Sequence, residues 1–167
     1  PDPNTHAGEI ICRGTNLMLG YYKNPEATAQ IIDKDGWLHT GDLGTMDNQG
    51  YVTIRGRSKN LLLNSSGHNI YPEEIESKLN NMLYVSESLI VLQNDKLVAL
   101  IYPDFDEAFA NGLQQPDIEK AMENNRIELN LQLPSYSQIT KVKIHFEEFE
   151  KTAKKSIKRF MYQEAKG

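Results

Sequence analysis

The stretch "GRSKNLLLNSSGHNIYPEEIE", residues 56–76, constrains the fold more than any other part of the sequence. Its three successive leucines, 61–63, indicate a short buried strand, and the polar run "NSSGHN" that follows them is typical of a turn. Pro72 then marks a helix start, since proline is well tolerated at the first helical position and the acidic residues after it suit the helix dipole. The pattern predicts a flexible turn held between two rigid elements.

A helix over 71–83 follows, because Ile75, Leu79, Met82 and Leu83 recur on one face. The next apolar runs, within 86–104, predict a β-hairpin that turns at Asn94-Asp95.

A second amphipathic helix is predicted over 116–129, with its apolar face through Ile118, Met122 and Leu129. The segment 141–149 alternates apolar residues (Val142, Ile144, Phe146) with polar ones, which favours a half-exposed strand. Two helices on a small sheet predict a compact domain of the α+β class.

The N-terminal third reads as a small β-rich piece. A strand is predicted over 8–14, and a helix over 23–32 with Asn24 as its N-cap and Pro25 at its first position. Two further strands are expected, Trp37–His39 and Tyr51–Arg55, joined by a loop. A few short strands without a covering layer are marginal in water, so this piece is expected to pack against more protein.

Charge and cysteine content exclude some classes of protein. The 18 Lys and Arg residues against 23 Asp and Glu leave a net charge of -5, which argues against a nucleic-acid partner. The single Cys12 excludes an internal disulfide, and the four histidines do not lie at metal-ligand spacing with it. A reducing cytoplasm suits such a chain. No segment reaches the roughly 18 apolar residues that a membrane helix needs.

Three stretches could carry chemistry, and each has a plainer interpretation. Gly67, with Ser66 and His68 beside it, would let a ligand approach the backbone, although surface loops often look like this. The turn Thr40–Asp42 is open to the same two interpretations. The basic run Lys151–Arg159 fits a solvated terminal helix or a contact with a specific anion.

The order of four stretches favours the chemical interpretation. "GYYKNPEAT", "GWLHTGDLG", "GYVTIRGRSKNLLLNSSGHNIYPEEIE" and "KTAKKSIKR" resemble, in sequence and spacing, the closing motifs of the adenylate-forming superfamily. The chain most resembles the C-terminal part of a long-chain fatty acid CoA ligase. The resemblance implies two domains: residues 1–58 as the β-rich end of a large adenylation domain, and residues 59–167 as a small mobile C-terminal domain.

That family activates a carboxylic acid with ATP to an acyl-adenylate and then transfers the acyl group to coenzyme A. The resemblance assigns Asp42 and Arg57 to the ribose of ATP. It makes Lys59 the hinge about which the small domain rotates between the two reactions, a task that suits an exposed residue between domains.

The remaining assignments concern two loops. The resemblance places Ser66, Gly67 and His68 along the passage for coenzyme A. The family's late lysine, which offsets charge at the carboxylate and α-phosphate, is assigned to Lys155, with Lys154 as the alternative. The family pattern has a glycine directly before this lysine, a position that counting back from "IKR" assigns to Lys154.

The resemblance also implies what this chain needs from elsewhere. The phosphate-binding loop, the adenine site, the magnesium ligand and the fatty acid tunnel belong to upstream sequence, so the isolated chain is expected to be inactive. Membrane association of the parent protein stays open. Two other functions remain: a related ligase for another acid, and an interaction module derived from this domain.

Overall fold

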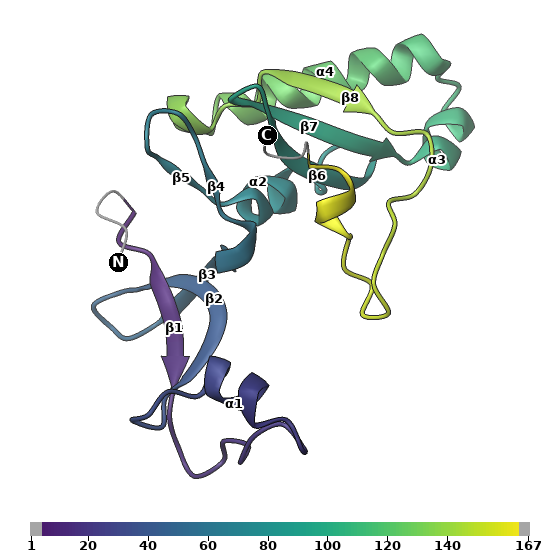
Figure 1. Cartoon of the computed structure of the whole chain (residues 1–167). Coiled ribbons are helices and arrows are strands. Elements are labelled where there is room, and N and C mark those ends of the chain that lie inside the picture. The colour runs from purple at the N-terminus through teal and green to yellow at the C-terminus, as the bar shows by residue number, and fades with distance from the viewer. Residues whose placement is uncertain (1–4, 164–167) are drawn as a thin grey trace. The chain divides into compact units, whose positions relative to one another are not determined.

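The structure is a computed structural model that describes residues 5–163. The chain divides after Leu61 into two compact units, with bounds at Leu61 and Leu62. The outer ends of both predicted domains, 1–4 and 164–167, lie outside the described residues. Figure 1 labels the elements along the chain.

The first unit is a three-stranded antiparallel sheet with one short helix. Its strands are β1 (Gly8–Cys12), β2 (Leu38–Met46) and β3 (Val52–Arg57), in the order β1-β2-β3. The helix α1 (Pro25–Ile31) begins as predicted, with the Asn24 side chain accepting a hydrogen bond from the Ala27 N–H at 3.0 Å. A single 3-10 turn, η1 (Ser58–Asn60), follows β3.

One strand of this unit differs from the prediction. The strand expected at Trp37–His39 extends through Met46 as β2, so the Thr40–Asp42 segment lies within a strand rather than in a loop. The strand is longer than predicted because β2 pairs with β1 on one side and with β3 on the other. Both pairings provide hydrogen-bond partners for its backbone groups. Gly41 takes a φ of +72°, which bends the strand without ending it.

The second unit is an α+β domain. A short hairpin, β4 (Leu62–Leu63) and β5 (Asn69–Ile70), leads into helix α2 (Pro72–Leu79). The sheet contains β6 (Val85–Gln93), β7 (Lys96–Pro103) and β8 (Lys141–Ile144); β6 and β7 are antiparallel, whereas β7 and β8 are parallel. Helices α3 (Phe105–Ala110) and α4 (Gln115–Asn130) connect β7 to β8, with the 3-10 turn η2 (Ser135–Ser137) between α4 and β8.

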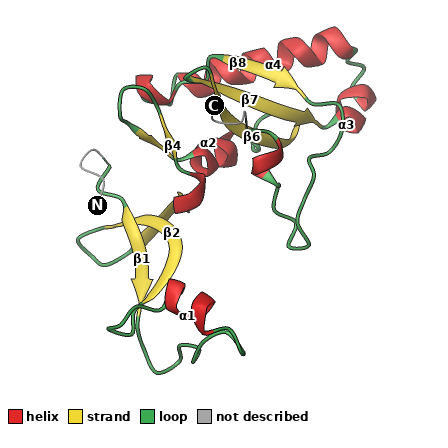
Figure 2. Ribbon diagram, in the orientation of Figure 1, coloured by secondary structure: helices red, strands yellow, loops and turns green. Residues whose placement is uncertain are grey.

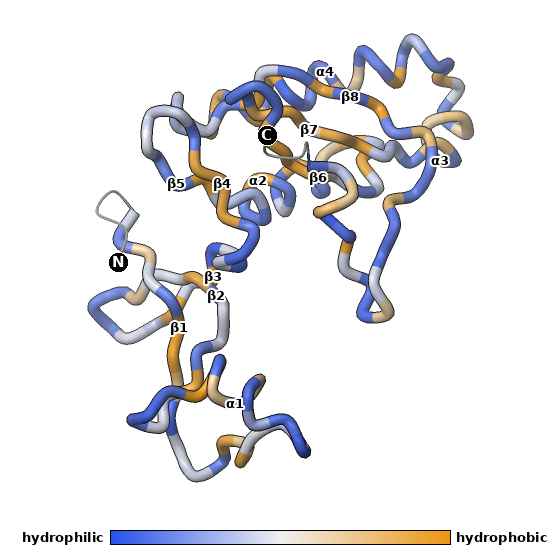
Figure 3. The backbone as a smooth tube through the Cα atoms, in the orientation of Figure 1, coloured by the Kyte–Doolittle hydropathy of each residue, from blue (hydrophilic) through white to orange (hydrophobic). Residues whose placement is uncertain are grey.

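Both faces of the strand pair β6–β7 are covered. Helices α2 and α4 cover one face (Figure 2). Their Leu79 and Met122 belong to one buried apolar cluster with Ile90 and Ile101 of the strands. The opposite face carries Leu89, Val91, Val98 and Leu100, and Phe149 from the C-terminal segment is buried on it. Coverage on both faces explains the nearly unbroken apolar runs of β6 and β7, seen as orange stretches of the backbone in Figure 3. The predicted α+β class, a small mixed sheet with covering helices, is confirmed.

Two helices depart from the expectation. Helix α2 ends at Leu79 instead of 83, because Asn80 and Asn81 close it in turns, and the Asn81 side chain donates to the Ser77 carbonyl at 2.6 Å. Helix α3 was missed, although Asp104 caps it by accepting from the Glu107 N–H at 2.9 Å. The Asp-x-x-Glu spacing is a helix-start signal that could have found it.

The C-terminal segment also differs. Strand β8 ends at Ile144, because the chain turns away there, and Phe146 is exposed instead of facing the core. The basic run 151–159 forms no terminal helix. Lys151 and Ile157 pair in an antiparallel bridge, and a 3-10 turn, η3 (Arg159–Met161), follows. Packing of Ile157 on the sheet cluster favours this extended path.

Candidate functional site

The two residues predicted to contact ribose meet in the first unit. Asp42 on β2 and Arg57 on β3 lie directly opposite each other in the antiparallel register. Arg57 Nε is 2.9 Å from Asp42 Oδ1, and Arg57 Nη1 donates to the Thr40 carbonyl at 3.2 Å. Both side chains remain partly open to solvent, so a ligand hydroxyl can reach the carboxylate. The pair presents a hydrogen-bond acceptor and a donor side by side.

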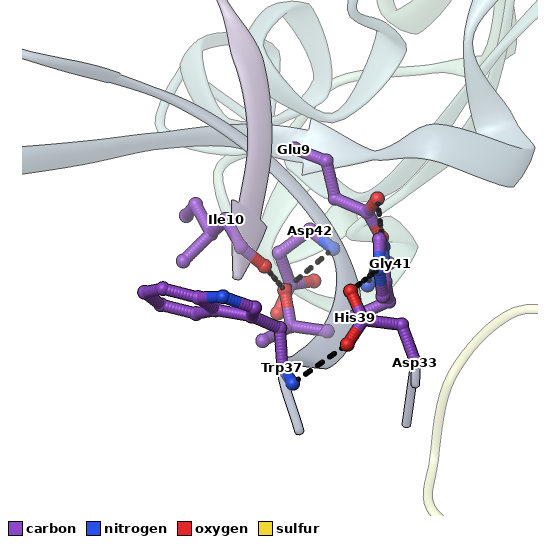
Figure 4. A network of polar contacts seen from close by, with 8 residues as sticks. Glu9, Ile10, Asp33, Trp37, His39, Gly41 and Asp42 are labelled. Carbon is purple, nitrogen blue, oxygen red and sulfur yellow. Dashed lines mark hydrogen bonds and ion pairs between the residues drawn. The ribbon is translucent and has the colours of Figure 1, made fainter. Parts of the chain in front are cut away.

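A hydrogen-bond network holds the strand that carries Asp42 (Figure 4). The Thr40 hydroxyl donates to the Ile10 carbonyl at 2.6 Å and accepts from the Asp42 N–H at 3.1 Å. Glu9 accepts from the Gly41 N–H at 3.1 Å through its Oε1. Strand β1 therefore fixes the backbone on which Asp42 sits.

His39 lies between two carboxylates in the same network. Its Nδ1 is 2.8 Å from Glu9 Oε2, and its Nε2 is 3.5 Å from Asp33 Oδ2. The hydrogen bond to Glu9 is the main cause that raises the pKa of His39, and the Asp33 bond adds to it. In return, the His39 bond lowers the pKa of Glu9, while backbone N–H donors, the Trp37 N–H first, lower that of Asp33. Sequence reasoning missed this triplet, because its members come from three separate segments.

The predicted hinge residue, Lys59, lies in the 3-10 turn Ser58–Asn60, and its side chain is exposed. The chain divides into its two units between Leu61 and Leu62. The role of Lys59 as a hinge stays a prediction.

The loop predicted to lie along the coenzyme A passage is the connection between β4 and β5. Asn64 organises it: Asn64 Oδ1 accepts from the Ser66 N–H at 3.1 Å and from the His68 N–H at 2.9 Å. Gly67 has a φ of +78°, and an added Cβ would meet no atom of this chain within 4 Å. The glycine is therefore required by its backbone conformation, not by crowding from its own domain. The space above it is open to another molecule.

Tyr136 supports this loop from a distant part of the sequence. Its ring stacks on the His68 ring with centroids 4.6 Å apart and planes 11° from parallel. Its carbonyl accepts a hydrogen bond from Asn64 Nδ2 at 3.3 Å. The Nδ1 atom of His68 is buried and has no hydrogen-bond partner in the described part of the chain. The Asn64-Ser-Ser-Gly turn was recognisable from sequence, whereas its contact with Tyr136 was not.

The predicted lysine loop is a tight hairpin. The Thr152 N–H donates to the Ser156 carbonyl at 2.8 Å, and the Lys155 N–H donates to the Thr152 carbonyl at 2.8 Å. Lys154, Lys155 and Ser156 are all exposed at the tip. Lys155 has a φ of +61°, and it alone of the three takes the left-handed conformation. The position suited to glycine is therefore 155, not 154 as the count along the sequence suggested.

Ion pairs and packing anchor the base of this hairpin. Arg159 Nη2 pairs with Glu76 Oε2 on α2, and both side chains are nearly buried. Lys151 Nζ lies 2.5 Å from Glu87 Oε1 on β6 and 3.1 Å from Glu148 Oε2. The Glu87 hydrogen bond is the first cause that raises the pKa of Lys151. These contacts hold the hairpin on the domain while leaving its tip free.

Neither a metal-binding cluster nor a membrane-spanning helix is found in the described part of the chain. Within residues 5–163, no group of three or more His, Cys, Asp or Glu side chains is arranged to hold a metal ion. No helix in the described part of the chain is both long and apolar enough to cross a bilayer.

Comparison with known families places the chain in one of them. The family described as the AMP-binding enzyme C-terminal domain matches residues 59–165. The chain belongs to this family.

Individual relatives are longer proteins. The chain is 52% identical over 84 residues to a 3-[(3aS,4S,7aS)-7a-methyl-1,5-dioxo-octahydro-1H-inden-4-yl]propanoyl:CoA ligase of Rhodococcus jostii, covering 50% of this chain and 16% of that protein. It is 33% identical over 157 residues to the probable acyl-activating enzyme 4 of Arabidopsis thaliana, covering 94% of this chain and 28% of that one. The chain thus spans less than a third of the length of either relative.

A solved structure extends the likeness to both units. The crystal structure of ATP-bound MatB from Rhodopseudomonas palustris superposes with a TM-score of 0.66 at 28% identity. The match covers 95% of this chain and 30% of that one.

Proposed function

We propose that this chain is the C-terminal part of an AMP-forming acid–CoA ligase. Such an enzyme forms an acyl-adenylate from a carboxylic acid and ATP and passes the acyl group to coenzyme A. Membership of the AMP-binding family and relatives named as CoA ligases support this proposal. The observation that carries it is the Asp42–Arg57 pair, which stands on adjacent strands where the resemblance requires a ribose contact.

In the first step, Asp42 accepts hydrogen bonds from the ribose hydroxyls of ATP, and Arg57 holds the carboxylate in place. Their 2.9 Å contact and partial exposure fit this task, because a carboxylate already oriented by a guanidinium loses little freedom on binding a diol. The lysine loop supplies positive charge near the carboxylate and α-phosphate, for which the proposed residue is Lys155. Mg²⁺ and the triphosphate are held by residues that we assign to the upstream part of the enzyme.

In the second step, coenzyme A enters along the β4–β5 loop. Gly67 presents bare backbone with open space above it, which suits a narrow pantetheine arm. Ser66 and His68 flank it, and stacking on Tyr136 limits the movement of the His68 ring. Rotation about Lys59 exchanges the two loops between the steps, because each step needs a different loop at the reacting acid.

The acid that we propose is a long-chain fatty acid, on the resemblance of "GHNIYPEEIE" and the closing basic run to that branch. The Rhodococcus relative is named for a fused-ring propanoyl substrate, so a bulky acid of another kind is the alternative. We assign the acyl pocket, and with it the choice of acid, to the upstream part of the enzyme.

The test uses the full-length protein that carries this chain, with ATP–pyrophosphate exchange measured over a panel of acids. Asp42→Asn keeps the shape of the side chain but removes its charge, and the expected result is at least a tenfold loss of exchange, or about 1.4 kcal/mol. Asp95→Asn, in the β6–β7 turn, is the matched control and should leave exchange unchanged. Full exchange in Asp42→Asn would overturn the proposal, and so would a wild type that supports neither exchange nor acyl-CoA formation with any acid of the panel.

A further inference from the structure

The hairpin 152–156 has a backbone that calls for glycine at one position. The hydrogen bond from the Lys155 N–H to the Thr152 carbonyl closes a four-residue turn, and Lys155 follows in the left-handed region at φ +61°. The bond from the Thr152 N–H to the Ser156 carbonyl then resumes the pairing. This arrangement is a β-hairpin with a three-residue loop, in which a turn is followed by a left-handed residue that forms a β-bulge. Glycine usually occupies that left-handed position. A lysine occupies that position here.

This observation changes which residue corresponds to the family's lysine. The pattern that the chain resembles places glycine directly before the lysine. If the left-handed position, 155, is that of the glycine, the lysine's position is 156. We propose that Ser156 occupies the place of the adenylation lysine, and that Lys155 supplies the charge from one residue earlier. This inference rests on the proposed function.

The neighbouring residues show why one residue matters. Ile157 packs toward the cluster formed by Leu89 and Phe149, whereas Ser156 is exposed. Because successive side chains of an extended segment point to opposite sides, position 156 projects away from the domain. A lysine at 156 would extend into the space in front of the hairpin, but the serine there carries no charge. The Cα atom of Lys155 lies about 3.8 Å from that of residue 156, and it belongs to the turn.

The consequence is a selective defect. A misplacement of about 1 Å can reduce a rate by about a hundredfold, so adenylation by this protein should be slow. Thioester formation should not share the defect, because the loop around Gly67 keeps its glycine and its Asn64 hydrogen bonds. The protein should therefore use a supplied acyl-adenylate more efficiently than it makes one.

The experiment compares variants of the full-length protein in two assays: ATP–pyrophosphate exchange, and acyl-CoA formation from synthetic acyl-adenylate and coenzyme A. Lys155→Gly/Ser156→Lys restores the Gly-Lys order, and exchange should rise at least tenfold while the second assay stays unchanged. Ser156→Lys alone should give part of the rise in exchange, and this single variant tests the inference if the double variant does not fold. Lys155→Ala should remove the residual exchange. Lys120→Ala, an exposed lysine on α4, is the matched control.

The opposite results are equally clear. A double variant with exchange equal to or below wild type, together with loss of exchange in Lys155→Ala, would show that Lys155 already stands in the correct place and would overturn the inference. Loss in Lys154→Ala instead of Lys155→Ala would also overturn it. If no variant supports either assay with any acid, the proposed function itself fails, and this inference fails with it.

Discussion

Removing one partner of the nearly buried pair between Glu76 and Arg159 should strongly destabilise the second unit. Glu76 lies on α2, and Arg159 follows the lysine hairpin 83 residues later. Their side chains are 10% and 13% exposed. The second carboxylate oxygen of Glu76 accepts from the Ile90 N–H on β6 at 2.7 Å. Replacing Arg159 by alanine would leave a desolvated carboxylate with only that backbone donor.

The magnitude follows from this geometry. Removing one partner of a buried ion pair typically costs 3–5 kcal/mol, and the retained Ile90 bond favours the lower end, about 3 kcal/mol. With a urea dependence of about 1.5 kcal/mol per molar, the unfolding midpoint should fall by about 2 M. Circular dichroism of the purified chain in urea measures this shift.

The control is a pair of the same type at the surface of the same hairpin. Lys158 Nζ is 3.3 Å from Glu150 Oε2, and both side chains are substantially exposed. Lys158→Ala should cost below about 1 kcal/mol, since exposed ion pairs contribute little. Equal midpoint shifts for Arg159→Ala and Lys158→Ala would refute the reasoning.

The effect of Arg159→Ala should depend on pH. Burial raises the pKa of Glu76, although Arg159 and the Ile90 N–H partly offset this. A raised folded-state pKa favours the protonated folded form, so stability is greatest below the ordinary carboxyl pKa and falls as pH rises through the folded value. Loss of Arg159 removes an offsetting charge and raises that pKa further. The deficit of the variant should therefore be larger at pH 8 than at pH 5, and Glu76→Gln added to it should recover stability at pH 8.

Three further outcomes are expected. Glu9→Gln should lower the pKa of His39, which NMR titration of its ring protons measures. The stabilisation that a raised histidine pKa gives is present at low pH and is lost as the pH rises through that pKa. An unchanged His39 titration in the variant would contradict the network. Lys155→Gly should stabilise the second unit against urea by about 0.5–1 kcal/mol by relieving the left-handed lysine, and destabilisation would argue against that conformation. Met122→Ala, at a fully buried position on α4, should cost about 2–5 kcal/mol in thermal unfolding, and a smaller loss would mean that the core repacks.

Much of the fold could be predicted because its signals are local. Asn24 and Pro25 start α1, and Pro72 starts α2, since a cap or a fixed φ acts within one helical turn. The turn at Asn94-Asp95 is confirmed, with both residues at positive φ as a tight hairpin requires. Where local signals were weak, as at the ends of β2 and α2, the bounds were wrong.

Both the sequence and the tertiary structure were needed to identify the candidate site. The sequence alone identified Asp42, Arg57 and Gly67 as candidates, because their residue types and order resemble those of a known family. Only the tertiary structure decided that Asp42 and Arg57 face each other, since strand register is set by pairing along the whole sheet. The stacking of Tyr136 on His68 likewise joins segments that no local pattern connects.

The lysine hairpin shows most clearly what the sequence determined and what the tertiary structure determined. The sequence by itself established a basic run near the end of the chain and the residue types within it. Which residue takes the left-handed position was decided by the packing of Ile157 on the sheet and by the Arg159–Glu76 pair, which set where the hairpin begins and ends. Backbone conformation at a turn depends on how its two ends are held. The two anchors of this hairpin are distant in sequence: Glu87 on β6 precedes Lys151 by 64 residues, and Glu76 on α2 precedes Arg159 by 83.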